Sequence, residues 1–538
     1  MKLSLLPQRI GHLTSFAAAL LLLAIGATNT ALAQKSGGIL RVYHRDSPAS
    51  MSIHEEATWS TIAPMSAVFN NLVIYDQHIK QNSLATIRPE LAESWSWSED
   101  GKDLTFKLRH GVKWHDGKPF TAADVKCTWD LLTGKGPEKL RLNPRATWYL
   151  NLDSVTTNGD DEAVFHMKRP QPAFIALLAS GDSPVYPCHV PAHEMRLHPI
   201  GTGPFKFVEY KPNETLKLAR NPDYWKPGLP YLDGIEYTII PNRSTALLGF
   251  VAGKFDMTFP YEITIPLLKD IKSQAPNVIC DTEPLNVAVT LAIVRKPPFD
   301  NLDVRRAVAM ALDRQAFINI LGEGQGDISG IMQPPPEGLW GIPLDQLRPL
   351  PGYGTDVEKS RSEAREIMKK LGYGPDNPLK TKVSTRNIAG YRDPATILID
   401  QLKSVYIDAE LDTVETANWT PKLTRKDYTL AISLSGSAVD DPDQIFYESY
   451  VCKSPRNYTG YCNPEVEALI DQQSMQADPE KRKAIVWDIE RRIAADVARP
   501  VIFHARAATC WQPYVKNITQ MSNSVYNSWR LEDAWLDK

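Results

Sequence analysis

The chain has 538 residues, a formal net charge of −3 at pH 7 and 23% charged residues. This mildly acidic balance excludes the basic surface that nucleic-acid binding requires, so no nucleic-acid partner is expected. At about 150 residues per domain, the length predicts two to four domains.

The first 33 residues have the pattern of a secretory signal peptide. Lys2 and Arg9 make the start basic, residues 16–25 form an unbroken apolar run, and residues 31–33 (Ala-Leu-Ala) form a small-x-small cleavage site. The apolar run is shorter than a good membrane span, although an uncleaved anchor is the alternative. We therefore expect cleavage after Ala33 and a location in the periplasm.

Alternating apolar and polar residues predict strands in the first half of the mature chain. LTFKLRHGVKW (104–114) predicts a strand with one buried face, and a helix is expected to begin after Thr121. Residues 201–225 contain two alternating runs joined at Lys211–Asn213, which predict a hairpin. YLDGIEYTIIP (231–241) predicts a further strand.

A helical period replaces this alternation in the second half. Residues 301–321 place apolar side chains on one helical face. Residues 356–374 do the same up to Gly372, which is expected as a left-handed cap, and residues 478–496 begin with Asp478 as an N-cap. Interleaved strands and helices predict an α/β fold.

Six cysteines in an oxidising compartment predict disulfides. Cys452 and Cys462 flank a turn-rich loop and are the expected pair, with two free thiols as the alternative. Cys127 lies in a predicted helix, where a small buried apolar residue is the simplest interpretation. The sequence does not pair the remaining cysteines, Cys188, Cys280 and Cys510, and no CxxC motif is present.

Catalytic motifs are missing from the sequence. It contains neither HExxH nor GxSxG, the patterns of zinc proteases and serine hydrolases, so no enzyme is expected. His189 and His193 are spaced i, i+4 beside Glu194, but Pro191 lies between them, so the helical setting of a metal-binding pair is absent. We predict no metal site and no cofactor; stoichiometric zinc would revive the enzyme hypothesis.

Four segments stand in a characteristic order along the chain: IRPEL…TAADV (87–125), GTGPF…YTIIP (201–241), PFDNL…FINIL (298–321) and EKSRS…KLGYG (358–374). In this order they resemble the family 5 extracytoplasmic solute-binding proteins of ABC importers, which bind oligopeptides, dipeptides, nickel or opines. The resemblance extends from about residue 38 to residue 510. It implies a type II periplasmic-binding-protein clamshell, no catalytic machinery, no cofactor, and an ABC permease and ATPase as partners of a monomeric receptor.

The resemblance also implies how the chain divides. Lobe I would comprise residues 34–75, 201–285 and 512–538, with an extra subdomain of residues 76–200 packed on it. Lobe II would comprise residues 286–511. A small-molecule or peptide ligand would be enclosed between the two lobes.

The segment SGSAVDDPDQIF (435–446) matches part of the family's cleft wall. In peptide binders, a carboxylate four positions before the matching proline pairs with the amino terminus of the ligand. Counting back from Pro442, that position is Ala438, so the resemblance implies ligands without a conventional free amino terminus, such as opine or sugar conjugates. Asp440 would replace the missing carboxylate if the loop shifted by two residues. Asp441 and Asp443 fit a structural turn, and the DxDxDG pattern of calcium loops is absent.

Further candidates come from other segments of the chain. Trp419 matches a tryptophan of the family's pocket, with a packed core residue as the alternative. Arg386 and Arg392 flank NIAGY, where guanidinium groups would meet a carboxylate or phosphate unless they are simply solvated. Met51, His54 and Trp59 lie in a segment that resembles cleft residues near the start of the family. The predicted ligand-binding residues are Trp419, Ser437, Ala438, Asp440, Arg386, Arg392, His54 and Trp59.

The predicted function is therefore that of a periplasmic substrate-binding protein. It would capture a peptide-like or other polar organic solute and deliver it to an ABC importer. The alternatives within the same fold are an opine, sugar-conjugate or metal-chelate binder and a receptor that presents a signal molecule. A periplasmic hydrolase is disfavoured because the catalytic motifs are missing.

Overall fold

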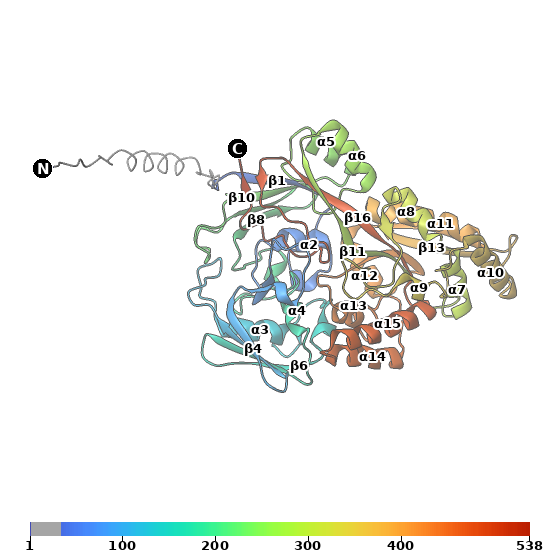
Figure 1. Ribbon diagram of the computed structural model, residues 1–538, viewed down its shortest axis with the longest axis horizontal. Coiled ribbons are helices and arrows are strands. Elements are labelled where there is room, and N and C mark those ends of the chain that lie inside the picture. The colour runs from blue at the N-terminus through green and yellow to red at the C-terminus, as the bar shows by residue number, and fades with distance from the viewer. Residues whose placement is uncertain (2–33) are drawn as a thin grey trace.

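The computed structural model describes Met1 and residues 34–538, so the predicted signal peptide lies outside the described residues. Two halves of the molecule lie side by side, and the long strands β11 and β16 run between them (Figure 1). We call the half that contains the N-terminal strand lobe I and the other half lobe II. Among the described residues, no helix combines the length and apolar character needed to cross a membrane.

Lobe I is built on a four-stranded sheet in the order β1-β10-β9-β8. Its strands are β1 (Ile39–His44), β8 (Phe205–Lys211), β9 (Thr215–Arg220) and β10 (Gly234–Ile239). The predicted hairpin is confirmed as the antiparallel pair β8 and β9. Around the sheet lie the helices α2 (Trp59–Met65), α5 (Arg243–Val251) and α6 (Ile265–Gln274), and the C-terminal strands β17 (Val515–Lys516) and β18 (Trp535–Leu536).

An extra subdomain packs beside lobe I around its own apolar cluster. Its main sheet has the order β4-β5-β7-β6, with β4 (Ala92–Trp97), β5 (Asp103–Leu108), β6 (Leu152–Thr157) and β7 (Glu162–Met167). A smaller sheet pairs β2 (Val73–Tyr75) with β3 (Ile87–Pro89), and the helices are α3 (Ala122–Leu132) and α4 (Phe174–Ala179). Helix α3 begins as predicted, because Thr121 and Asp124 form a capping box.

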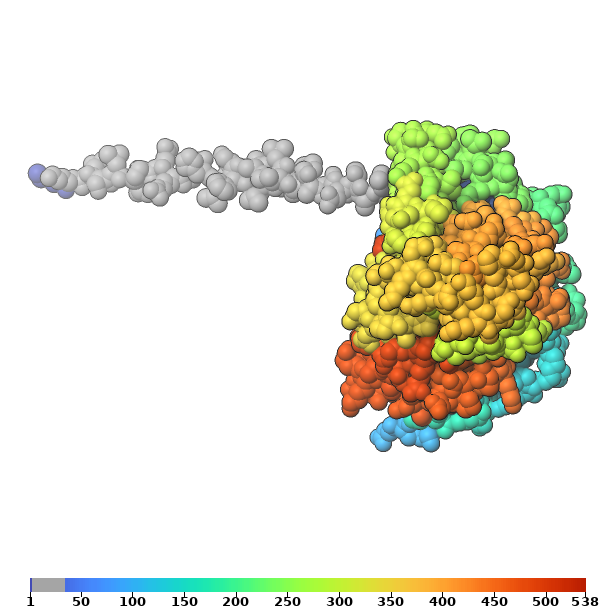
Figure 2. All heavy atoms as spheres, turned by 90° about the vertical axis from the view of Figure 1, so that its right-hand side faces the viewer, coloured from blue at the N-terminus to red at the C-terminus, as the bar shows by residue number. Residues whose placement is uncertain are grey.

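Lobe II contains a six-stranded sheet in the order β12-β16-β11-β15-β13-β14. Its strands are β11 (Ile279–Ile293), β12 (Gly326–Asp327), β13 (Leu379–Arg386), β14 (Ile407–Val414), β15 (Leu430–Gly436) and β16 (Val501–Trp511). Its helices are α7 (Leu302–Ala311), α8 (Arg314–Gly322), α9 (Leu344–Leu347), α10 (Val357–Lys370), α11 (Ala389–Lys403), α12 (Thr416–Thr424), α13 (Pro442–Ser449), α14 (Pro464–Met475) and α15 (Pro479–Ala495). Figure 2 views lobe II from outside, with α14 and α15 (red-orange) below the yellow and orange segments and next to the blue-green subdomain.

Residues 301–321 are helical as predicted, but the prediction of one continuous helix is wrong. The structure divides the segment into α7 and α8. Asp313 lies at the break, and its side chain accepts a hydrogen bond from the backbone N–H of Ala316. An aspartate that caps a new helix offers the backbone an alternative to continuing the old one. Helix α15 begins after the predicted cap Asp478, and α10 ends just before Gly372, whose φ of 88° is the left-handed conformation that was predicted.

A ribbon of two antiparallel strands joins the lobes. β11 pairs with β16 from Ile279↔Trp511 to Pro284↔Arg506, and the register then shifts before pairing resumes at Ala288↔His504. One end of the ribbon packs in the apolar cluster of lobe I and the other end in that of lobe II. The chain therefore passes from lobe I to lobe II on β11 and returns on β16.

Three disulfides pair all six cysteines. Cys452 is bonded to Cys462, the pair expected from the sequence. Cys280 is bonded to Cys510 across the β11–β16 ribbon. The third bond joins Cys127 to Cys188, so the interpretation of Cys127 as a buried apolar residue is wrong. Periodicity within α3 could not reveal this bond, because its partner lies 61 residues away.

Candidate functional site

A cavity of about 120 Å³ lies between the two lobes and is lined by both. Lobe I contributes residues that follow β1, the start of α2, the segment before α6 and part of the C-terminal segment. Lobe II contributes the ends of β13 and β15, helices α11 and α12, and the loop after α13. Larger hollows of about 480 and 770 Å³ are lined by the extra subdomain alone and by lobe II alone. The cavity shared by the lobes is therefore the candidate ligand site.

Aromatic side chains form two opposite walls of this cavity. The wall from lobe I consists of Trp59, Tyr261 and Tyr526, and the wall from lobe II consists of Tyr391, Trp419 and Tyr458. Trp59 and Tyr526 meet edge to face with ring centroids 5.1 Å apart, and Tyr391 and Trp419 do so at 5.9 Å. Such packing fixes the ring orientations, so each wall is preorganised.

Three arginines, Arg45, Arg386 and Arg456, also line the cavity, whereas no aspartate or glutamate of the described residues does. Each guanidinium is paired on its far side with a carboxylate that lies outside the lining. Arg45 Nη1 lies 3.1 Å from Glu262 Oε2, and Arg456 donates to Glu448. The polar surface of the cavity therefore presents cationic donors.

Arg386 differs from the other two because it joins the lobes. Its Nη2 donates to Asp46 of lobe I and, at 3.0 Å, to Ser60 Oγ, while its Nε donates to Thr416 Oγ1 at 2.8 Å. Thr416 in turn donates to Asp46 at 2.6 Å. Burial alone would raise the pKa of Asp46, but the adjacent guanidinium of Arg386 holds it below its usual value. Asp46 is thus a carboxylate that closes lobe I onto lobe II.

Arg456 and Tyr458 reach the cavity from a short loop between α13 and α14. The disulfide Cys452–Cys462 closes this loop. Asn457 holds it from inside, because its Nδ2 donates to the carbonyl oxygens of Val451 and Tyr461 at 3.1 and 2.5 Å. A covalent closure and two buried hydrogen bonds therefore fix where Arg456 stands.

Several predicted residues lie at this cavity. Trp59, Arg386 and Trp419 line it, and none of the three is a solvated surface residue. Arg392 is exposed and donates to Asn387 Oδ1 at 3.2 Å, so it lies outside the lining.

His54 and Met51 are buried in the interior rather than at the cavity. His54 Nε2 donates to the carbonyl of Pro184 at 2.8 Å, and its ring packs against Tyr186 with centroids 4.3 Å apart. Burial lowers the pKa of His54 to about 3, so the ring stays neutral. The structure gives both residues a packing role.

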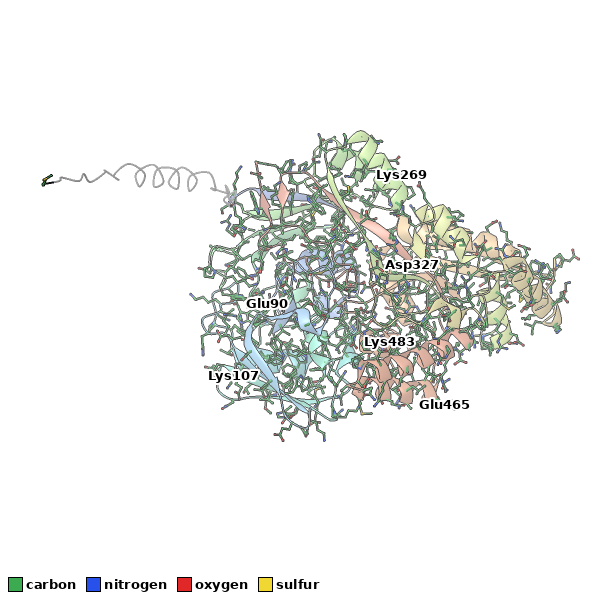
Figure 3. All side chains as sticks on the ribbon, in the orientation of Figure 1. Glu90, Lys107, Lys269, Asp327, Glu465 and Lys483 are labelled. Carbon is green, nitrogen blue, oxygen red and sulfur yellow. A yellow bond between two sulfur atoms is a disulfide. The ribbon has the colours of Figure 1, made fainter. Side chains whose placement is uncertain are left out.

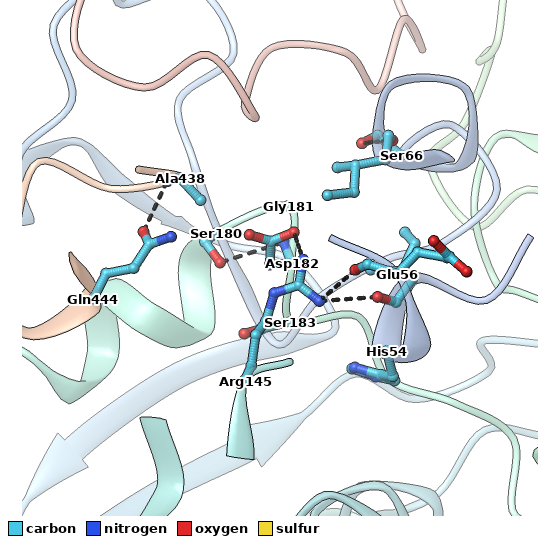
Figure 4. A network of polar contacts seen from close by, with 12 residues as sticks. His54, Glu56, Ser66, Arg145, Ser180, Gly181, Asp182, Ser183, Ala438 and Gln444 are labelled. Atoms are coloured by element: carbon cyan, nitrogen blue, oxygen red, sulfur yellow. Dashed lines mark hydrogen bonds and ion pairs between the residues drawn. The ribbon is translucent and has the colours of Figure 1, made fainter. Parts of the chain in front are cut away.

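Ser437 and Ala438 also lie behind the cavity rather than in its lining, which ends at Gly436. The backbone N–H of Ala438 donates to Gln444 Oε1 at 2.7 Å (Figure 4). Ser437 Oγ donates to the same oxygen at 2.8 Å. Near Ala438, the carboxylate of Asp182 is paired with Arg145 Nη2 at 2.6 Å (Figure 4). The carboxylate of Asp182 is therefore not free to replace the one that Ala438 lacks.

Asp440 does not take over this role, because it lies outside the lining of the cavity and its carboxylate is hydrogen-bonded within the protein. Its Oδ2 accepts hydrogen bonds from Leu339 N at 2.9 Å and from Asn523 Nδ2 at 3.1 Å. Burial raises its pKa to about 7. Asp440 thus joins a loop of lobe II to the C-terminal segment of lobe I.

Asp441 and Asp443 have the structural role that the turn pattern indicated. Asp441 caps α13 by accepting from the backbone N–H of Asp443 at 2.9 Å. Arg482 binds Asp441 through Nη1 and Nη2, both at 2.7 Å, and reaches Asp443 at 3.1 Å. These acids therefore hold α13 against α15.

The two histidines of the sequence pair contact different acids. His189 Nε2 lies 2.7 Å from Asp116 Oδ2, and His193 lies 3.2 Å from Glu194. Within residues 34–538 there is no group of three or more His, Cys, Asp or Glu side chains placed to hold a metal ion.

Sequence reasoning missed most of the lining. Arg45, Arg456 and the four tyrosines lie in loops or at element ends, where the fold rather than a motif brings them together. One signal was present: Arg456 and Tyr458 lie inside the loop that the predicted disulfide closes. Conformationally fixed surface loops are common carriers of binding residues.

Comparisons with known proteins agree with this geometry. Residues 86–457 match the model of the bacterial extracellular solute-binding proteins, family 5. The chain belongs to this family. It is 26% identical over 456 residues to the oligopeptide-binding protein AppA of Bacillus subtilis, with 79% of each chain covered.

Solved structures show the same two-lobed type II fold. The ABC transporter-associated periplasmic binding protein DppA of Helicobacter pylori, in complex with the peptide STSA, superposes with a TM-score of 0.82, 22% identity and coverage of 94% of this chain and 99% of that chain. The binding protein AgaA of Agrobacterium tumefaciens R10, in complex with agropinic acid, gives a TM-score of 0.81, 22% identity and coverage of 93% and 99%. One fold therefore holds a peptide in one relative and agropinic acid in another.

Proposed function

We propose that this protein captures a peptide-like or other polar organic solute between its two lobes and delivers it to an ABC permease and ATPase in the inner membrane. It would act in the periplasm after removal of the first 33 residues. The observation that supports the proposal is the cavity, which takes one aromatic wall from each lobe. A solute in contact with both walls binds the closed arrangement better than an open one, and so shifts the lobes toward closure.

Ala438 and the absence of acidic side chains from the described lining favour solutes without a free amino terminus. A buried ammonium group without a carboxylate partner loses its hydration and gains nothing in return. Opine and sugar conjugates are therefore favoured over ordinary peptides. The structural relative AgaA, which was solved with agropinic acid, supports the same class of solute.

A thermal-shift screen of the mature protein tests the proposal. The screen contains opines, oligosaccharides and di- to pentapeptides, since a solute that binds only the folded state raises Tm. At 100 times its Kd, a solute stabilises the protein by about 2.7 kcal/mol. Small-angle scattering of each hit is then expected to show a smaller radius of gyration than the free protein. Turnover of a bound compound, or a molecule that never compacts, contradicts the proposal.

A further inference from the structure

We propose that the interlobe cavity is specific for an amine-free carboxylate with a flat body, and that Arg456 and Arg45 receive the carboxylate. The inference rests on the proposed function and names the class of solute and the residues that select it. Arg386, the arginine that the sequence singled out, has a different task because it bonds the lobes to each other.

The charges around the cavity favour an anion. Three guanidinium groups line it, and the acids that balance them, Asp46, Glu262 and Glu448, lie outside the lining. An ammonium group in this cavity would meet three cations and no carboxylate of the described lining. A ligand carboxylate would instead accept charge-assisted hydrogen bonds, which are stronger than neutral ones.

The donors of Arg386 are largely used by the protein. Its Nε and Nη2 donate to Thr416, Asp46 and Ser60, and the residue is only 1% exposed. A ligand that took these donors would leave Asp46 buried without its partner, which is costly.

Arg45 and Arg456 have donors to spare. Among the described residues, each guanidinium donates a hydrogen bond only through Nη1, to Glu262 in one case and to Glu448 in the other. The Nε atoms of both are buried without a hydrogen-bond partner. The Nη2 atoms of both donate to no described residue and are not among the enclosed atoms, so they are the N–H groups that a carboxylate of the solute can reach.

The walls define the body of the solute. Six aromatic rings, three from each lobe, enclose a space of about 120 Å³. A cavity of about 150 Å³ is enough to hold benzene. The space between the walls is of this order, so it suits at most a single ring or a planar group that stacks on the faces of the walls, whereas an extended oligopeptide does not fit.

Three probes of nearly equal shape separate the charge requirements. 3-Phenylpropanoate has the carboxylate alone, L-phenylalanine adds an ammonium group, and 3-phenylpropanamide is neutral. Calorimetry at pH 7.5 with about 1 mM probe measures the three affinities. We expect 3-phenylpropanoate to bind, and the other two probes to bind about tenfold more weakly or worse. A tenfold loss corresponds to the loss of one charge-assisted contact.

The residue assignment is tested with matched variants. Arg456→Gln alone would leave the buried carboxylate of Glu448 without its arginine, so the test uses the double variant Glu448→Gln/Arg456→Gln. The second double variant, Glu262→Gln/Arg45→Gln, likewise removes both partners of the Arg45 ion pair. Each double variant is expected to bind 3-phenylpropanoate with an affinity lower by about tenfold or more. Arg392→Gln, which removes an exposed arginine outside the lining, is the control and is expected to bind like the wild type.

Each result decides a separate point. Tighter binding of L-phenylalanine or of free-amine peptides overturns the solute class but leaves the proposed function standing. No binding of any of the three probes overturns the flat-carboxylate assignment, while the wider screen judges the proposed function by itself. Unchanged affinity in both double variants, with Tm values showing that they are folded, overturns the role of the two arginines.

Discussion

At the scale of single residues, the contact between Arg386 and Asp46 shows why an arginine cannot be assigned from its neighbours in the sequence. The sequence predicted a guanidinium that meets a ligand anion, and the structure supplies that anion from lobe I. Both side chains are less than 10% exposed. Removal of one partner of such a pair costs more than removal of both, because it leaves a buried charge alone.

Arg386→Gln is therefore expected to lower the free energy of unfolding by about 3 kcal/mol. Chemical denaturation at pH 7 measures the change. The double variant Asp46→Asn/Arg386→Gln is the control and should recover a large part of the loss. Equal losses in the single and double variants would show that the ion pair is not the cause.

Asp440 gives a prediction about pH. Its pKa is near 4 in an unfolded chain and about 7 in the fold, so between these values the folded state binds the extra proton. Stability due to this residue is therefore highest below pH 4, falls as the pH rises to 7, and is level above 7. Asp440→Asn keeps an oxygen that accepts the hydrogen bond from Leu339 N, and it removes the cost of burying an ionised carboxylate.

At pH 7.5 we expect Asp440→Asn to be more stable than the wild type by about 1 kcal/mol, and at pH 4 the two should be equal. Thermal unfolding across this pH range checks the difference. A lower stability of the variant at every pH would mean that the ionised carboxylate is the favoured form in the fold.

At the scale of elements, the loop between α13 and α14 depends on its disulfide. The loop places Arg456 and Tyr458 in the cavity, and the disulfide closes it beside the apolar cluster that contains Val451 and Tyr461. A disulfide across a loop of this length stabilises a fold by about 2–3 kcal/mol in the chain-entropy account. Its loss should therefore affect binding more than the rest of the fold.

The variant Cys452→Ser/Cys462→Ser is expected to lose about 2 kcal/mol of stability and to bind any solute found in the screen at least about tenfold more weakly. Calorimetry and thermal unfolding measure the two effects. Cys127→Ser/Cys188→Ser is the matched control, because that disulfide lies in the extra subdomain away from the cavity, and its affinity should stay unchanged. Equal affinity losses in both variants would point to a general loosening.

Elements with strong local patterns could be predicted from the sequence, and contacts between distant segments could not. The hairpin β8–β9, the start of α3 and the caps of α10 and α15 follow from alternation, periodicity and capping residues. The break at Asp313 was missed because the apolar face continues across it. Of the candidate residues, Trp59, Arg386 and Trp419 line the cavity, whereas Arg45 and Arg456 were not predicted, because only the packed lobes bring them to it.

At the scale of the whole molecule, the lobes touch along a line of polar contacts beside the ribbon. Asn286 lies at the shift of register in β11, and its Nδ2 donates to Ser437 O in lobe II and to Asn523 O in lobe I, both at 2.6 Å. Further out, Lys269 of α6 in lobe I, labelled in Figure 3, pairs with Glu323 at the end of α8 in lobe II. The buried contact at Asn286 is worth more than the exposed pair, which solvent screens.

Asn286→Ala is expected to lower the free energy of unfolding by about 2 kcal/mol and to increase the radius of gyration of the ligand-free protein, since it removes the bonds that join the lobes at the ribbon. Small-angle scattering measures the opening. Lys269→Ala is the control and should change neither quantity appreciably. A compact Asn286→Ala protein would show that other contacts set the angle between the lobes.

The two crossings between the lobes are strands of one ribbon, tied together by backbone hydrogen bonds and by Cys280–Cys510. Two separate linkers would let the lobes swing, slide and twist, whereas a paired ribbon resists shear and bends most readily where its ladder is interrupted. We therefore expect the lobes to move relative to each other mainly by bending of this ribbon. Whatever compound fills the cavity, a docking partner would sense the same quantity, the bend of a single ribbon.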